Sequence, residues 1–215
     1  AGIGLLSSRF LLEGPIKKDK ASFIISARRT YIDMLLKPFM PANSQGGYFF
    51  YDLTAKANWE INKKNKIFIS SYLGRDKLFG NYSSYQSNSK NGLFWDNTTA
   101  TIRWNRLISN KIFSNASFIV SDYLLKIYLM EEYAGDKFEL SYRSGIRDVG
   151  LKYDLSWIPN PKHTIRFGIS SVHHRFTPSA VVIRDDNQNQ FSREVKTINT
   201  IESGLYVEEE MKIAD

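Results

Sequence analysis

Residues 48–73 read YFFYDLTAKANWEINKKNKIFISSYL, and this stretch decides the fold. From residue 49 to residue 61 every second side chain is apolar or aromatic, and from residue 52 onward the side chains between them are polar. Successive side chains of a β-strand point to opposite faces, so the run predicts a strand with one apolar and one polar face. The residues NKKNK at 62–66 break the pattern and predict a turn, after which residues 67–73 form the returning strand of a β-hairpin.

The same hairpin recurs along the chain. Trp59, Trp104 and Trp157 each stand eight residues before an isoleucine, with a short turn containing Asn and Lys between the two. Repetition at an interval of about 50 residues predicts an array of antiparallel hairpins.

The connections between these strands are expected to alternate between short and long. Polar stretches with scattered aromatic residues at 75–92 and 178–195 are interpreted as long loops, and the prolines and glycines of 38–47 mark another. The connection near 132–136 is expected to be brief, and a phase change near 145–148 predicts a β-bulge or bend. No helix is expected, and residues 21–36 are interpreted as a strand.

This pattern gives eight or nine strands of roughly 10–15 residues, longer than the average of about 5–6 residues for strands in soluble domains. Tight turns at one end and long loops at the other are typical of a transmembrane antiparallel β-barrel. We therefore predict an all-β fold of this kind.

Composition narrows the class of protein further. The chain has 215 residues, no cysteine and a net charge of +7. The missing cysteines exclude a disulfide framework and a thiolate metal site. Many lysines concentrate at the predicted short turns, so the positive charge indicates solvated strand ends rather than nucleic-acid binding. No window approaches the roughly 18 apolar residues of a membrane-spanning helix, but a β-strand crosses with about 10 residues, half of them polar.

The beginning of the chain resembles a known family. AGIGLLSSRFLLE followed by GPIKKDKASFIISARRTYID is similar to the start of the barrel in TonB-dependent outer-membrane receptors of Bacteroidetes. YFFYDLTAKANWEINKKNKIFISSYLGRD and TTATIRWNRLISNKIFSNASFIVSDY fit the same pattern, so the resemblance covers most of the chain.

The resemblance implies a barrel of about 22 strands that imports a scarce nutrient, such as a siderophore, glycan, peptide or cobalamin, across the bacterial outer membrane. It implies contact with outer-membrane lipid, with the TonB complex through an N-terminal plug domain, and in one branch with a surface lipoprotein. This sequence contains neither a plug nor a TonB box. We therefore expect residues 1–215 to be the N-terminal portion of the larger barrel.

The alternation also assigns candidate site residues. Polar side chains expected to face the lumen or the plug are Asp52, Lys56, Asn58, Glu60, Arg103, Lys152 and Asp154. Aromatic side chains expected to contact a ligand near the longest polar loop are Tyr82, Tyr85 and Trp95. The side chains expected to form the girdle at the membrane interface are Trp59, Trp104 and Trp157.

No catalytic set and no cofactor site emerge from the sequence, so the protein is not expected to be an enzyme. His173 and His174 at a strand end, and Asp185 and Asp186 in a loop, are more simply solvated side chains than metal ligands. Two other functions stay open at this stage. One is a small passive porin of about eight to ten strands, and the other is a soluble β-rich module that binds glycans.

Overall fold

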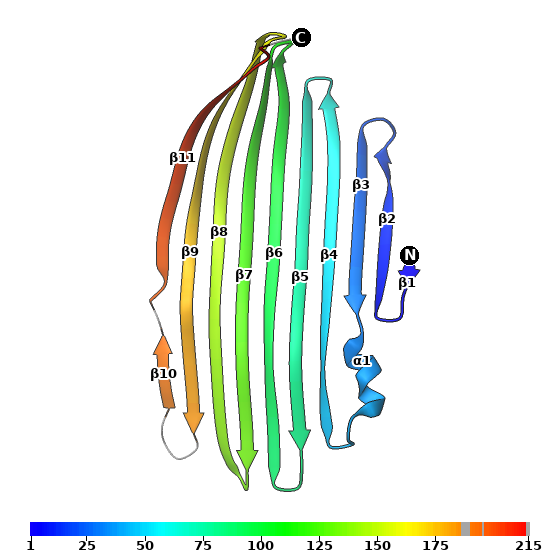
Figure 1. The fold of residues 1–215 in the computed structure, drawn as a ribbon, viewed down its shortest axis with the longest axis vertical. Coiled ribbons are helices and arrows are strands. Elements are labelled where there is room, and N and C mark those ends of the chain that lie inside the picture. Colours follow the sequence, from blue (N-terminus) through cyan, green and yellow to red (C-terminus); the bar gives the residue numbers. More distant parts are fainter. Residues whose placement is uncertain (186–189, 195, 214–215) are drawn as a thin grey trace.

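The chain forms one β-sheet, a single layer of long antiparallel strands (Figure 1). The computed structural model describes the backbone of residues 1–185, 190–194 and 196–213, and the side chains of residues 1–178 and 196–213. The strands are β1 (Gly2–Ile3), β2 (Ser7–Lys17), β3 (Ala21–Thr30), β4 (Ser44–Asn62), β5 (Asn65–Ser83), β6 (Ser87–Ser109), β7 (Ile112–Tyr133), β8 (Asp136–Asn160), β9 (His163–Asp185), β10 (Gln190–Glu194) and β11 (Ile198–Met211).

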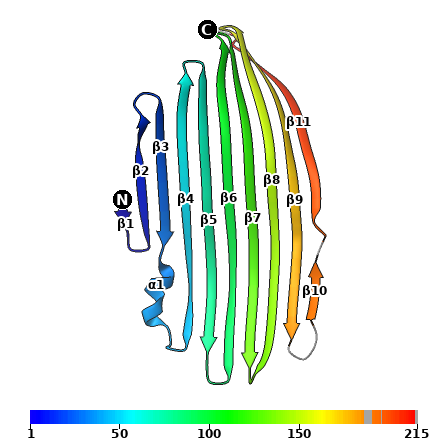
Figure 2. The same cartoon turned by 180° about the vertical axis from the view of Figure 1, so that it is seen from behind.

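Strand order in the sheet follows the sequence from β1 to β10. β11 pairs with the other part of β9, so β10 and β11 follow one another along the same edge of the sheet (Figure 2). Every neighbouring pair is antiparallel, which is the topology of a meander of hairpins. Within the described chain, the strands at the two edges of the sheet do not pair with each other. The described residues therefore form 11 strands, more than the expected eight or nine, because the short strands β1 and β10 add to the predicted set.

One end of the sheet carries turns rich in lysine, at residues 18–20, 63–64, 110–111 and 161–162, and we call it the lysine end. In the last three turns a polar side chain accepts a hydrogen bond from the amide two residues later. Asn62 caps Lys64 at 2.9 Å, Ser109 caps Lys111 at 3.3 Å and Asn160 caps Lys162 at 3.0 Å. Such local caps favour turns over strand pairing, which explains why Asn or Ser recurs before Lys. The predicted short turns are confirmed.

The opposite end, which we call the far end, differs from the prediction. The expected loop at 75–92 is strand throughout except for residues 84–86, because β5 and β6 pair without interruption from Asn65↔Arg106 to Ser83↔Asn88. The expected loop from 178 onward begins as a continuation of β9 to Asp185. The brief connection near 132–136 is confirmed as the turn at 134–135. Long strands thus replace most of the predicted long loops.

The expected strand over 21–36 ends early. After β3 stops at Thr30, residues 32–36 form the short helix α1 (Ile32–Leu36), followed by the 3-10 turn η1 (Lys37–Phe39). Pro38 explains the end of the helix, because proline has no amide hydrogen to donate the next backbone hydrogen bond of α1. This segment lies against the β4 side of the far end (Figure 1).

The phase change near 145–148 predicted a bulge or bend in β8, but the irregularity that the structure shows there belongs to the neighbouring strand β9. β7 and β8 pair continuously from Ile112↔Trp157 to Tyr133↔Asp136. The register shift lies in the next ladder, between Arg143↔Ala180 and Gly145↔Thr177, and the additional residue is on β9 beside Pro178. Proline lacks an amide hydrogen and is tolerated in sheets at such irregular positions. The phase change of β8 reflects a different feature, a change in which face carries its apolar side chains.

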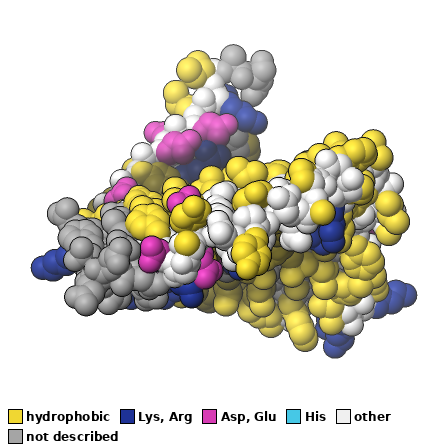
Figure 3. Space-filling model, turned by 90° about the horizontal axis from the view of Figure 1, so that it is seen from below, with side chains coloured by type: hydrophobic (Ala, Val, Ile, Leu, Met, Phe, Trp, Pro, Cys, Tyr) yellow, Lys and Arg dark blue, Asp and Glu magenta, His cyan; other side chains and the backbone are white. Residues whose placement is uncertain are grey.

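The sheet has no hydrophobic core of its own. Among the described side chains, Ala21 is the one hydrophobic side chain that is buried. Many large apolar side chains are exposed, and hydrophobic side chains cover much of the surface seen along the strands in Figure 3. No helix in the described part of the chain is long and apolar enough to cross a bilayer. A single layer of this kind leaves its apolar side chains available to an external apolar phase.

Candidate functional site

Directly paired residues of an antiparallel ladder point to the same side, so the register divides the sheet into two faces. Face A carries Trp59, Ile69 and Ile102, and face B carries Asn58, Lys56 and Arg103. In the half of the sheet near the lysine end, the two faces differ in polarity as the sequence predicted.

Face B in this half is a polar wall. All seven side chains predicted to face the lumen lie on it: Asp52, Lys56, Asn58, Glu60, Arg103, Lys152 and Asp154. Asn58, Arg103 and Lys152 lie in one row across the strands, and a hollow of about 830 Å³ is lined by Lys56, Asn58 and Arg103 among others. The structure therefore brings the predicted residues together on one surface.

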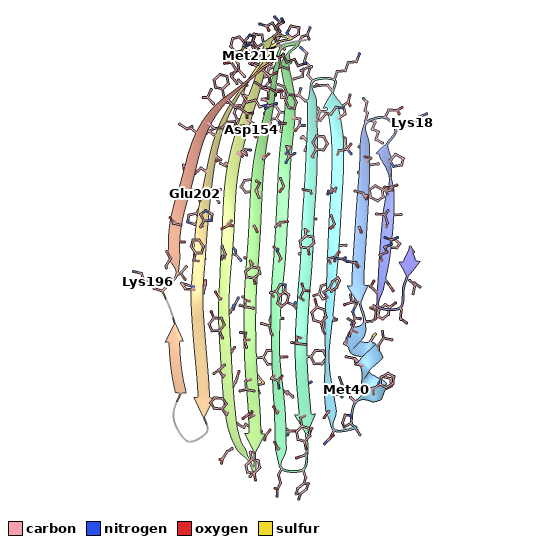
Figure 4. The ribbon with its side chains drawn as sticks, in the orientation of Figure 1. Lys18, Met40, Asp154, Lys196, Glu202 and Met211 are labelled. Atoms are coloured by element: carbon pink, nitrogen blue, oxygen red, sulfur yellow. The ribbon has the colours of Figure 1, made fainter. Side chains whose placement is uncertain are left out.

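Ion pairs and hydrogen bonds, within one strand and between neighbouring strands, connect this polar wall. Arg28 contacts Asp52 at 2.7 Å. Lys152 lies 3.3 Å from Asp154, and the Tyr206 hydroxyl donates to the same carboxylate at 2.8 Å. Figure 4 labels Asp154 close to the lysine end. These groups are partly exposed, so each pair contributes little to stability, but together they maintain a hydrated surface.

Lys56 and Arg103 have no ion-pair partner among the described side chains. They line the hollow of the polar wall and stay available to an anionic group. The described side chains of the polar wall can bind a ligand through charge and hydrogen bonds.

Face A in the same half is an apolar band that includes the three predicted girdle residues. Trp59 is 51% exposed, Trp104 41% and Trp157 39%. Rows such as Ala57–Ile69–Ile102–Phe118–Leu151 run across the strands without a charged side chain. Trp59 and Trp104 share one row, and Trp157 lies on the same face two rows further toward the lysine end.

Trp104 lies toward the margin of the apolar band that is nearer the lysine end. Its indole Nε1 donates to the Asn65 side chain at 3.0 Å, and the Arg106 guanidinium lies 5.6 Å from the ring centre. An aromatic ring with one apolar side and one hydrogen-bonding edge suits the boundary between an apolar phase and water.

Toward the far end the polarity of the two faces is reversed. Face B becomes apolar and aromatic: Tyr48, Phe50, Leu78, Leu93, Trp95, Leu125, Ile127 and Tyr142 lie on it. Face A becomes charged: Arg29, Arg75, Lys77, Asp96, Asp122, Lys126, Arg143, Arg147 and Arg175 lie on it. The strands pass straight through this reversal, so the apolar band of face A ends where the apolar wall of face B begins.

The aromatic wall of face B contains one strong hydrogen bond. The Tyr48 hydroxyl donates to Asp76 at 2.6 Å, and this bond, more than burial or charge repulsion, raises the pKa of Tyr48 from 10.0 to about 12. Next to it, the Arg28 guanidinium lies 4.7 Å from the centre of the Phe50 ring. This far half lies beyond the apolar band of face A.

The three predicted ligand-contact residues do not form one cluster. Trp95 lies on face B between Asp76 and Leu125, and Tyr82 lies on the same face but pairs with Ser89, closer to the strand ends. Tyr85 stands at the tip of the turn at 84–86 and is fully exposed. A hollow of about 520 Å³ at the far end is lined by Tyr82, Lys90, Glu131 and Phe138 but not by the other two.

Sequence reasoning missed the aromatic wall as a surface. Leu93, Leu125, Ile127 and Tyr142 come from segments whose far halves were interpreted as loops or left without an assigned face. The available signal was a period of two with shifted phase, as in Tyr123, Leu125, Ile127 and Leu129.

No group of three or more His, Cys, Asp and Glu side chains in the described chain could hold a metal ion. His174 instead contacts Asp148 at 2.8 Å on the polar wall. The side chains of Asp185 and Asp186 lie outside the described residues.

A single-layered antiparallel sheet with an apolar band on one face and a polar wall on the other is the construction of an outer-membrane barrel wall. The sheet has the fold of part of a solved uptake receptor, the ferric yersiniabactin uptake receptor FyuA from Yersinia pestis. The TM-score is 0.59 at 9% sequence identity, and the match covers 94% of this chain and 34% of that receptor.

The chain thus spans about a third of the receptor's length. No family model and no curated protein matches the sequence. The likeness confirms the predicted barrel fold. The Bacteroidetes origin stays a prediction.

Proposed function

We propose that this chain forms part of the wall of a TonB-dependent importer in the bacterial outer membrane. Face A of the half near the lysine end would contact lipid, and face B would line the lumen. The lysine turns would lie on the periplasmic side, where barrels of this kind have their short turns, and the far half would project outside the cell. The proposal depends on one observation: the described sheet has no hydrophobic core, and its apolar band is confined to one face.

The height of the band supports a bilayer as its environment. Residues 53–61 of β4 span roughly 20 Å along the membrane normal at about 3.4 Å per residue and a tilt of about 40°. With Tyr51 at the margin, between Arg29 and Arg75, the band approaches the height of about 25 Å of the outward apolar band of outer-membrane barrels. A soluble glycan-binding module would have to cover this band with a second layer, and the described chain forms a single sheet.

The open edges support a larger barrel over a small porin. Unpaired backbone groups at a sheet edge cost several kcal/mol each in lipid. Within the described residues, the two edge regions of the sheet are not joined. Further strands at both edges would satisfy these groups, as in the barrel of about 22 strands that the sequence resemblance implies.

Active transport and its partners rest on the family resemblance and on the likeness to a receptor described as taking up ferric yersiniabactin. We propose that energy reaches the barrel from the TonB complex through a plug domain within the lumen. A surface lipoprotein is a further proposed partner. A siderophore, glycan, peptide and cobalamin are equally compatible with these strands.

Accessibility labelling tests the membrane assignment. Single spin labels at Leu53, Ala57, Ile102 and Leu155 on face A should contact lipid, whereas labels at Lys56 and Arg103 on face B should contact water. Equal accessibility of the two sets, or the reverse order, would overturn the assignment.

A transport assay tests the importer. Cells that depend on the protein for a limiting nutrient should lose uptake when the proton-motive force is dissipated. Uptake that persists without energy would favour the passive porin.

A further inference from the structure

We propose that the arginine-rich part of face A binds the phosphate groups of an anionic lipid in the outer leaflet. The inference rests on the proposed membrane location, and it assigns a partner to a surface that transport itself does not use.

The first observation is the position of the charge. Face A carries its cations directly beyond the apolar band, so a bilayer that covers the band places its headgroups at this level. On β7 and β8, Val120 and Val149 form the last apolar row, and Asp122 and Arg147 form the next. The charged rows therefore lie at the height of the headgroups.

The second observation is an arrangement that is unfavourable without an anion. Arg147 and Arg175 are direct neighbours on paired strands, and so are Lys126 and Arg143. Like charges directly opposite each other destabilise a sheet. Asp122 neutralises Arg147 at 2.6 Å, but Lys126, Arg143 and Arg175 have no ion-pair partner among the described side chains. The rows hold more positive charge than the described side chains compensate.

The third observation is a hollow among these arginines. A hollow of about 410 Å³ has most of its lining on face A, where Asp122, Arg143, Gly145, Arg147, Arg175 and Thr177 contribute to it. Gly145 contributes no side chain between Leu124 and Thr177, which leaves space in the row between the guanidinium groups. Guanidinium groups bind phosphate through paired hydrogen bonds and suit this ligand better than lysine does.

Aromatic side chains alternate with the cations in the neighbouring row, which reads Phe49, Lys77, Phe94, Lys126 and Arg143 across the strands. Aromatic and basic side chains together are typical of an interface between apolar chains and charged headgroups. We infer that the acyl chains lie along the apolar band and that the phosphate occupies the arginine hollow.

The test uses the protein in nanodiscs of neutral phosphatidylcholine that contain a small fraction of lipid A, whose phosphate groups are monoesters. Insertion is first verified with the label at Leu53. Lipid A that remains with the protein after exchange into neutral detergent is then measured by mass spectrometry, with dephosphorylated lipid A and free inorganic phosphate as separate arms.

The variant Arg143→Gln/Arg175→Gln removes the two arginines of the hollow that have no ion-pair partner among the described side chains. It should retain about 20-fold less lipid A, since each surface cation contributes about fivefold to the binding of anionic lipid. The control Lys56→Gln/Arg103→Gln removes the same charge from face B and should retain lipid A as the parent protein does.

Equal retention of lipid A and its dephosphorylated form overturns the proposal, as does an equal loss in the control variant. Displacement of lipid A by millimolar inorganic phosphate would indicate a free-phosphate site and would also overturn it. A protein that does not insert contradicts the proposed function itself, whereas an inserted protein without lipid preference contradicts only this inference.

Discussion

The two halves of this sheet are built from the same strands but present opposite surfaces. Near the lysine end, face A is apolar and face B is polar. Toward the far end, face A carries arginine and lysine while face B carries Tyr48, Phe50 and Trp95. The environment of a strand therefore changes along its length, and the surroundings of each half follow from the polarity of that half alone.

The largest expected effect tests the lipid contact of the apolar band. Ile102→Arg places a charge at mid-band and should lower the free energy of unfolding by about 2–4 kcal/mol, whereas Leu124→Arg on the charged half of face A should cost less than about 1 kcal/mol. Urea unfolding of the inserted protein measures both. Thr101→Arg, one residue away on face B, is the matched control, and a loss there as large as that of Ile102→Arg would contradict the two-faced arrangement.

A second pair of variants distinguishes the role of Trp95 on face B from that of Trp104 on face A. Trp95→Ala on face B should weaken nutrient binding about tenfold, because an aromatic ring contributes about 1–1.5 kcal/mol to a stacking contact, and should leave insertion unchanged. Trp104→Ala should impair insertion and leave nutrient affinity unchanged. Binding is measured on cells and insertion by protease protection. If Trp95→Ala leaves affinity intact, Trp95 is not a ligand contact.

The Tyr48–Asp76 bond makes the far half sensitive to high pH. Because the pKa of Tyr48 is raised from 10.0 to about 12, the stability from this bond is fully present below pH 10 and is lost as the pH rises toward 12. Tyr48→Phe should cost about 1 kcal/mol at neutral pH and remove this pH dependence. Unfolding at a series of pH values measures it, and the same dependence in Tyr48→Phe would exclude Tyr48 as its source.

The smallest effect concerns the polar wall. Asp154→Asn removes the ion pair with Lys152 and weakens the bond from Tyr206, but both partners are partly exposed. The loss should be about 0.5 kcal/mol and should shrink further in 1 M salt. Thermal unfolding at low and high salt measures this difference. A loss of several kcal/mol would mean that the wall is buried against another part of the protein.

The sequence by itself determined the hairpins, the lysine turns and the two faces of the half near those turns. Alternation with a period of two specifies which residues of a strand share a face, and Asn62, Ser109 and Asn160 specify where each strand turns, both by local chemistry. All seven residues predicted for the polar wall therefore lie on one surface, and Trp59, Trp104 and Trp157 lie on the other.

Only the tertiary structure decided the far half. A segment such as 75–92, with charged and aromatic side chains mixed, has the composition of a loop. It becomes strand because its two arms, the far parts of β5 and β6, pair with each other and with β4 and β7, in a register that the hairpin turns at the lysine end already set. Pairing across strands is long-range, so the sequence of one strand does not show that Arg147 faces Arg175 or that Trp95 lies beside Leu125. The reversal of polarity is visible only when the rows of several strands are assembled.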